Sequence, residues 1–335
     1  MNSQSISSRN FGDRIGAIMK KNVPFLILLS LLILFSFIAP NFMTFGNLRI
    51  LIRQVSFSGI AAVGLMFVMI SGGIDLSIGS QIVLTNVLLA IMMVYGKMDP
   101  VVAIPLVLGV GILLGAINGL LSITLKIHPL IITLGTAAIY KGIGYIINMS
   151  RNIMGFPDSF RWLGQGYVWG VPVPVIIWVI VALVGAFVLN KTYFGRRVFA
   201  LGGNEEAARL AGVHINRMKV FLFMICGFTA AITSVLLLSR VFAGQTVTGQ
   251  GLEFDCLTAA LLGGVSFKGG EGSVFGLVVG ILIIGVLNNA MQLASFPDFS
   301  QTVVKGTVLL IAVAIDVYQK NRKAKATVSR VAMQP

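Results

Sequence analysis

Apolar runs of membrane-spanning length recur along this chain of 335 residues. Two of them, Val171–Leu189 and Val220–Leu238, flank a polar and basic segment at Gly195–Lys219. A run of about 20 apolar residues is long enough, as a helix, to cross the hydrocarbon core of a bilayer. The sequence therefore predicts a membrane protein that crosses the bilayer many times, with Gly195–Lys219 as a loop held at one membrane face.

The composition supports an all-α, polytopic membrane bundle. Hydrophobic residues make up 56% of the chain and charged residues only 11%, whereas soluble domains carry about 25% charged residues. The net charge is +14. Cationic loops on the inner face of a membrane protein explain such an excess, so we expect lipid as a partner and not nucleic acid.

The hydrophobic runs predict about ten membrane passages, including broken or half helices. The expected spans are Val23–Ala39, Ser56–Ile70, Gln81–Tyr95, Val101–Leu125, Leu130–Ile147, Val171–Leu189, Val220–Ser239, a half-helix or re-entrant piece at Cys256–Phe267, Ser273–Ala290 and Gln301–Tyr318. Asn41–Val55 is interpreted as an outer connector. This division gives an N-terminal tail at 1–21, a membrane domain at 22–319 with its main polar loop at 191–219, and a C-terminal tail at 320–335.

The distribution of cations tests this topology. With ten passages and both termini inside, 17 of the 25 Lys and Arg residues lie on the inner side and six on the outer side. The remaining two, Lys141 and Lys305, fall within spans. Because inner loops carry the excess of Lys and Arg, we expect both tails to be cytoplasmic.

The segment Gly195–Lys219 contains the signals of a short helix. Asn204 is a suitable N-cap, and Glu205 and Glu206 occupy the first turn, where carboxylates complement the helix dipole. Ala207 and Ala208 begin a small apolar face, and Gly212 is a suitable C-terminal stop. Such a helix is either a docking surface or a solvated connector, and its spacing favours neither.

The segment SGGIDLSIGS at Ser71–Ser80 interrupts a hydrophobic run and places Asp75 and Ser77 at membrane depth. Irregular backbone at that depth is tolerated only where protein or water covers it, and an ionisable group there points to function. The alternative is that Asp75 caps the helix that restarts near Leu76, close to the inner surface.

Three amides also fall at membrane depth: Asn118, Asn288 and Asn289. They could bind a neutral polar solute or only tie helices together. With Asp75 and Ser77 they are our candidates for a translocation path. Gly111, Gly115 and Gly119 stand four residues apart, a spacing that predicts close helix packing.

Signals of catalysis are missing from the sequence. There is no G-x-x-x-x-G-K-[ST] phosphate loop, so we expect the chain not to bind ATP. Cys226 and Cys256 lie in apolar runs, and His128 and His214 are isolated at loop edges. We therefore expect no enzyme activity, no catalytic residue, no metal site and no cofactor.

Four segments together resemble a known family. In chain order they are SGGIDLSIGS, KIHPLIITLGTAAIYKGI, GRRVFALGGNEEAARLAGVHINRMK and GLEFDCLTAALLGGVSFKGGEGSVFG. They resemble, in the same order, the motifs of bacterial ABC importer permeases of the ribose, galactose, xylose and allose class. The similarity runs from about Phe42 to about Asp316. The resemblance implies a permease subunit that passes a monosaccharide, a ribose-type pentose or a related hexose, across the inner membrane.

The resemblance also implies partners. These are a second copy of the chain, a cytoplasmic ATPase subunit and a periplasmic sugar-binding protein. The stretch Asn204–Gly212 matches the loop of the family that seats in the ATPase, which makes Asn204, Glu205, Glu206, Ala207, Ala208 and Gly212 the expected coupling residues.

Three rival hypotheses are also compatible with a multi-pass membrane chain. The first is a stand-alone secondary transporter, in which broken helices would form an ion site. The scarcity of charge in the spans and the capped helix both disfavour it. The second is a membrane enzyme, for which no catalytic constellation is present, and the third is a related ABC permease for a non-sugar solute.

Overall fold

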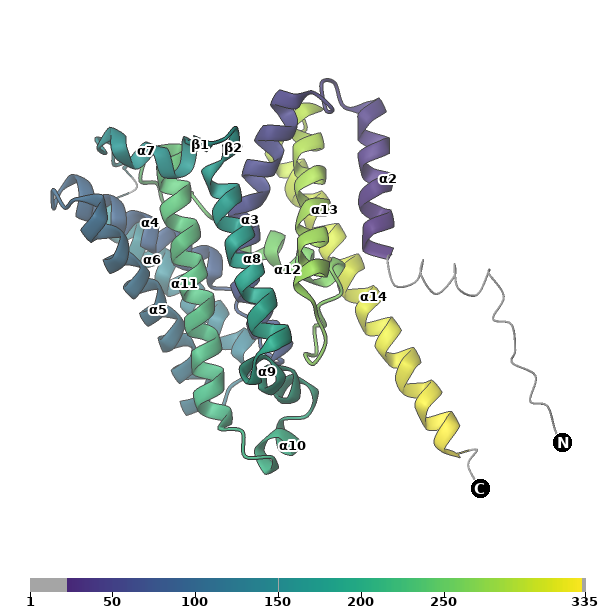
Figure 1. Cartoon of the computed structure of the whole chain (residues 1–335). Helices are drawn as coiled ribbons and strands as arrows, with labels where there is room; N and C mark the ends of the chain where they lie inside the picture. Colours follow the sequence, from purple (N-terminus) through teal and green to yellow (C-terminus); the bar gives the residue numbers. More distant parts are fainter. Residues whose placement is uncertain (1–22, 150, 333–335) are drawn as a thin grey trace.

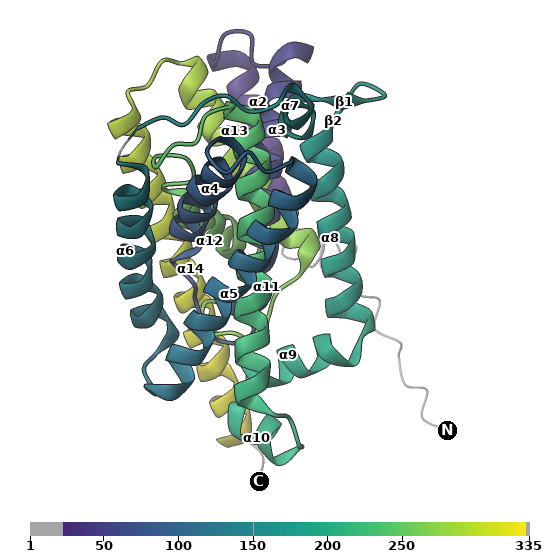
Figure 2. The same cartoon turned by 90° about the vertical axis from the view of Figure 1, so that its left-hand side faces the viewer.

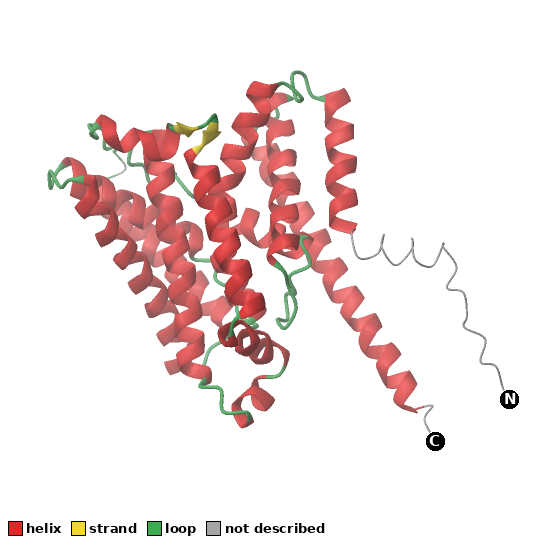
Figure 3. Cartoon of the chain, viewed as in Figure 1, coloured by secondary structure: helices red, strands yellow, loops and turns green. Residues whose placement is uncertain are grey.

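The computed structural model of the chain describes residues 23–149 and 151–332, which form a bundle of α-helices with one short β-hairpin (Figures 1 and 3). The elements are α2 (Val23–Ile38), α3 (Phe45–Ile70), α4 (Ile78–Val94), α5 (Pro100–Thr124), α6 (Pro129–Asn148), α7 (Asp158–Gln165), β1 (Tyr167–Val168), β2 (Val171–Pro172), α8 (Val173–Lys191), α9 (Tyr193–Gly203), α10 (Glu205–Leu210), α11 (Ile215–Val241), α12 (Leu252–Leu262), α13 (Val274–Leu293) and α14 (Asp298–Ala332). The tail expected at 1–21 lies outside the described residues. The tail expected from residue 320 continues α14 as far as Ala332.

The all-α membrane architecture is confirmed. In the described part of the chain, seven helices are long and apolar enough to span a membrane: α3, α5, α6, α8, α11, α13 and the Phe299–Tyr318 part of α14. The shorter apolar helices α2 and α4, together with the half-helix α12, account for the remaining passages. β1 and β2 pair as an antiparallel hairpin at the end of the bundle where α7 lies (Figure 1).

Residues 242–273 carry the chain from one end of the bundle to the other. At the upper end in Figure 1, the Gly164 amide of α7 donates to Ser239 Oγ of α11 at 2.7 Å. At the end where α9 lies, the Gly270 amide donates to the Ile70 carbonyl at 2.8 Å, and Gly270 lies against the last residues of α9. The segment that contains the half-helix therefore passes from one end of the bundle to the other and does not return to the end from which it came. The half-helix lies at Leu252–Leu262 and not at Cys256–Phe267, because Gly264 leaves the helix with a φ of +82°.

The prediction of an outer connector at Asn41–Val55 is wrong. Helix α3 begins at Phe45, where Thr44 Oγ1 accepts a hydrogen bond from the Asn47 amide at 3.4 Å. The helix continues beyond its apolar run, so it carries Arg49 and Arg53. Both guanidinium groups lie over the ring of Tyr167, at 5.4 and 4.6 Å from its centroid.

Helix α11 is the central packing element, and it contacts α3, α4, α5 and α7 (Figure 2). Its contact with α5 confirms the packing expected from the glycine spacing. A Cβ atom at Gly111 would lie 2.5 Å from the Gly227 carbonyl oxygen, and one at Gly115 would lie 2.1 Å from that of Phe223. The two backbones approach this closely because glycine carries no side chain.

Candidate functional site

The polar segment between α8 and α11 forms two short helices. The helix expected at Asn204–Gly212 is confirmed as α10, but α9 was missed by the sequence interpretation. The available signals were Thr192, whose Oγ1 accepts from the Gly195 amide at 3.2 Å, and Val198 with Leu201, which are spaced three apart and are both buried. Together α9 and α10 form a compact element at the lower end of the bundle (Figure 1).

Both ends of α10 are closed by hydrogen bonds of the expected kind. Asn204 Oδ1 accepts from the Ala207 amide at 2.9 Å. At the other end, Gly212 has a φ of +82°. Its amide donates to the Arg209 carbonyl, and the Val213 amide donates to the Ala208 carbonyl, each at 3.0 Å. This pair of bonds is a Schellman motif, which fixes where the helix ends.

The charges of α10 are paired, and its apolar side chains divide between core and surface. Lys219 Nζ of α11 lies 2.8 Å from both carboxylate oxygens of Glu205, and Glu206 pairs with Arg209. Ala208 is buried, whereas Ala207 and Leu210 are exposed. The element therefore combines paired surface charges with exposed apolar side chains at one end of the bundle.

The break after α3 is held by buried hydrogen bonds. Asp75 is fully buried. Its Oδ1 accepts from the amide of Ser77 at 2.9 Å and from the hydroxyl of Ser77 at 2.6 Å. Its Oδ2 accepts from Gln81 Nε2 at 3.2 Å. The carboxylate therefore holds the backbone in place just before α4 begins at Ile78. This arrangement resembles the alternative hypothesis, in which Asp75 caps the helix that restarts after the break.

Asn118 joins the same buried network from α5. Its Nδ2 donates to Ser77 Oγ at 2.7 Å, and its Oδ1 accepts from the Tyr140 hydroxyl of α6 at 3.0 Å. The structure thus brings three of the five path candidates together, with Gln81 and Tyr140 as members that the sequence interpretation missed. For Gln81, the signal was its position four residues after Ser77 on one helical face.

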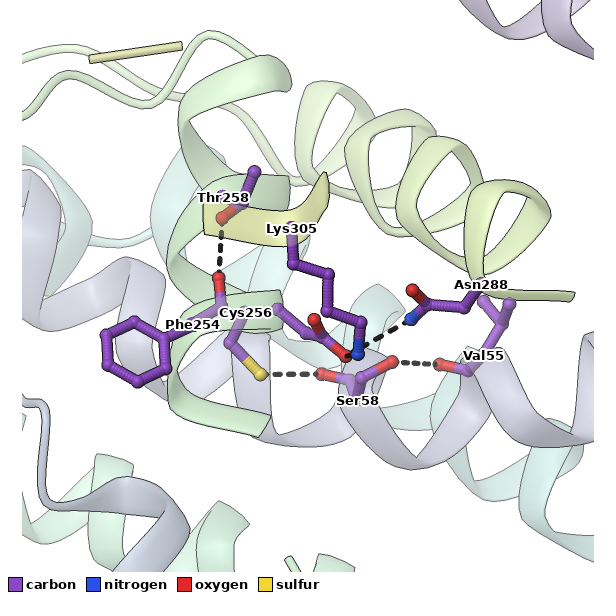
Figure 4. A network of polar contacts seen from close by, with 8 residues as sticks. Val55, Ser58, Phe254, Cys256, Thr258, Asn288 and Lys305 are labelled. Carbon is purple, nitrogen blue, oxygen red and sulfur yellow. Dashed lines mark hydrogen bonds and ion pairs between the residues drawn. The ribbon is translucent and has the colours of Figure 1, made fainter. Parts of the chain in front are cut away.

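The other two candidates, Asn288 and Asn289, point to different neighbours. Asn288 Nδ2 and Lys305 Nζ both approach Asp255 Oδ2, at 3.2 and 3.0 Å, so that α13 and α14 meet at the half-helix α12 (Figure 4). Asn289 exchanges two hydrogen bonds with Asn47 of α3, at 2.8 and 2.9 Å. The amides therefore form two separate clusters.

The two cysteines lie inside the bundle. Cys226 and Cys256 are both free and buried, and the Cys256 thiol donates to the Ser58 carbonyl at 3.4 Å (Figure 4). Across residues 23–149 and 151–332, no group of three or more His, Cys, Asp and Glu side chains is placed to hold a metal ion.

Comparison with protein families identifies the chain. The model of the branched-chain amino acid transport system / permease component family matches residues 47–313. This chain belongs to that family. A chain of this permease family with this set of apolar helices is a multi-pass membrane protein.

Curated relatives narrow the comparison within the permease family. The chain is 40% identical to the ribose import permease of Bacillus subtilis (strain 168), over 89% of this chain and 93% of the relative. It is 40% identical to the L-arabinose transport system permease of Escherichia coli (strain K12), over 86% and 87%. It is 37% identical to the D-allose transport system permease of the same strain, over 87% and 90%. The resemblance to monosaccharide importer permeases is thereby confirmed. No solved structure matches the chain.

Proposed function

We propose that this chain is the permease subunit of an ABC importer that passes a monosaccharide, a ribose-type pentose or a related hexose, across the inner membrane. The observation that carries the proposal is α10, a short helix fixed at both ends, at one end of a membrane bundle whose relatives are sugar importer permeases. Because the sequence has no phosphate loop, a separate ATPase subunit supplies the energy.

The α9–α10 end of the bundle is the cytoplasmic end in this proposal, and both termini are cytoplasmic. The 17 cations that the topology assigns to this side support the orientation. The ATPase docks on α10 and its caps, through Asn204, Glu205, Glu206, Ala207, Ala208 and Gly212. A periplasmic sugar-binding protein docks at the opposite end, around α7 and the hairpin. A second copy of the chain completes a homodimer.

The role of Asp75, Ser77, Asn118, Asn288 and Asn289 in the translocation path stays a prediction. Four of them hydrogen-bond to one another or to Asn47, which favours a role in holding helices together. Asn288 differs, because its buried Oδ1 has no hydrogen-bond partner among the described residues. Asn288 is therefore the path candidate that the geometry favours.

The proposal is tested by reconstitution of the whole complex. The chain is combined in liposomes with the co-encoded ATPase, and binding proteins loaded with ribose, xylose, allose or galactose are added in turn. We expect one loaded binding protein to stimulate ATP hydrolysis and sugar uptake together. The chain would instead be a stand-alone secondary transporter if it associated with no ATPase and passed solute by itself.

A second candidate is a permease of the same architecture for a non-sugar solute. The description of the matching family, which names branched-chain amino acids, favours it. Adding a binding protein loaded with leucine or valine to the same liposomes separates the two candidates. Stimulation by the amino acid but by none of the four sugars would support the non-sugar candidate.

A further inference from the structure

Three chain segments that are far apart in sequence meet beneath the bundle, next to α10. They are the end of α3 at Ile70, the end of α9 at Gly202, and Gly269–Gly270 in the loop between α12 and α13. The Gly270 amide donates to the Ile70 carbonyl at 2.8 Å. We call this meeting point, with Gly72, the glycine junction.

The glycine junction is packed backbone against backbone. A Cβ atom at Gly202 would lie 1.8 Å from the Ile70 carbonyl oxygen and 2.6 Å from the Gly270 nitrogen. One at Gly269 would lie 2.7 Å from the Gly72 nitrogen. Backbone atoms cannot rotate aside as a side-chain tip can, so the three segments cannot shift independently without losing these contacts.

Each of the three segments leads to a different moving part of the proposed importer. The end of α9 continues through Asn204 into α10. The end of α3 continues into the break that Asp75 braces. The loop after α12 is tied to α14, where Asp316 Oδ2 accepts from the Phe267 amide at 3.3 Å. The glycine junction therefore lies where the proposed docking helix α10 meets two interrupted passages. One is the break between α3 and α4, and the other is the passage that contains the half-helix α12.

We propose that the glycine junction transmits the displacement of α10 to the two interrupted passages, and that Gly202 is a positioning residue for translocation. This inference rests on the proposed function, because α10 moves only if an ATPase docks on it. When α10 is pulled, the end of α9 pushes directly on the carbonyl end of α3 and on the loop after α12. The segment between α3 and α4 and the loop after α12 then shift together.

The chain supplies a matched pair of variants. Gly202→Ala adds a methyl group into the contact with Ile70 and Gly270, whereas Gly203→Ala adds one where no heavy atom lies within 4 Å. Both variants are assayed as the full complex with ATPase and sugar-loaded binding protein in liposomes. We expect Gly202→Ala to bind the ATPase and to hydrolyse ATP while sugar taken up per ATP falls about tenfold, within the usual range of coupling between sites. Gly203→Ala should behave as wild type.

Wild-type sugar uptake per ATP in Gly202→Ala would overturn the inference while leaving the proposed function intact. An equal loss in both variants would overturn it too. If wild type binds no ATPase, the proposed function itself fails.

Hydrogen exchange of the wild-type complex tests the inference without any variant. We expect trapping with ATP and vanadate to change the exchange of 68–74, 200–204 and 264–272 together, with 96–100 at the other end of the bundle unaffected. A change confined to 200–204 would show that α9 moves alone and would overturn the inference.

Discussion

The side chains of Asn47 and Asn289 exchange two hydrogen bonds between α3 and α13, each amide donating to the carbonyl oxygen of the other at 2.8 and 2.9 Å. Both residues are buried. A reciprocal amide pair satisfies two polar groups at once, so that neither is left to compete for partners elsewhere. It fixes α3 against α13 near the end of the bundle where α3 begins.

We expect Asn289→Leu to lower the free energy of unfolding by about 1–2 kcal/mol, because the buried Asn47 Oδ1 loses its donor, although Asn47 Nδ2 keeps its hydrogen bond to the Phe42 carbonyl. Asn47→Leu with Asn289→Leu should cost less than the sum of the single variants, since no amide is then stranded. Unfolding in detergent, followed by circular dichroism, measures all three. Additive losses would show that the pair contributes no coupling.

The neighbouring residue, Asn288, should behave differently in transport. We expect Asn288→Ala to raise the sugar concentration for half-maximal uptake by about tenfold, because the buried Asn288 Oδ1 has no protein donor and would accept a hydrogen bond from a sugar hydroxyl once transport opens the site. Its control is Asn289→Ala, which should lower stability and leave that concentration unchanged. The measurement is uptake of radiolabelled sugar by liposomes. The path assignment of Asn288 fails if the two variants shift half-maximal uptake equally.

The contact between α5 and α11 should be intolerant of any side chain at Gly115. We expect Gly115→Ala to cost about 1–3 kcal/mol of stability, since its methyl group would meet the Phe223 carbonyl oxygen and force the helices apart. Gly109→Ala on the same helix meets no heavy atom within 4 Å, and should stay within about 1 kcal/mol of wild type. Thermal unfolding of the two purified variants decides the matter, and equal stability would contradict the packing argument.

Position 212, where Gly212 closes the end of α10, should tolerate asparagine but not valine. Gly212 has a φ of +82° and open space around its Cβ position, so a substitution acts through backbone strain and not through a clash. The left-handed conformation costs most residues about 1–2 kcal/mol, and Asn less than β-branched residues. We expect Gly212→Val to displace α10 and to lower sugar uptake per ATP by about an order of magnitude.

Gly212→Asn is the control for this variant and should retain most of the uptake. Measuring ATP hydrolysis and uptake on the same liposomes separates uncoupling from loss of assembly. Normal uptake with valine at this position would mean that the closing geometry of α10 is dispensable.

Local interactions made much of the molecule predictable. Asn204, Glu205 and Gly212 specify a short helix within a few residues of each other, and α10 forms as expected because capping depends on neighbours in sequence. The glycine spacing in α5 similarly predicted a close helix contact. The first turns of α3 were missed because hydropathy locates only the hydrocarbon layer. The helix extends past that layer, since Thr44 caps its start and the Tyr167 ring contacts the guanidinium groups of Arg49 and Arg53.

The sequence by itself determined the membrane class, the approximate number of passages and the position of α10, because hydrophobic length, cation placement and capping are properties of consecutive residues. Only the tertiary structure decided what the polar groups at membrane depth do. Ser77 meets Asn118, Asn289 meets Asn47, and Gly202 meets Ile70, across separations that no local pattern encodes. A buried polar group must find its partner wherever the fold provides one, so its role follows from packing between distant segments.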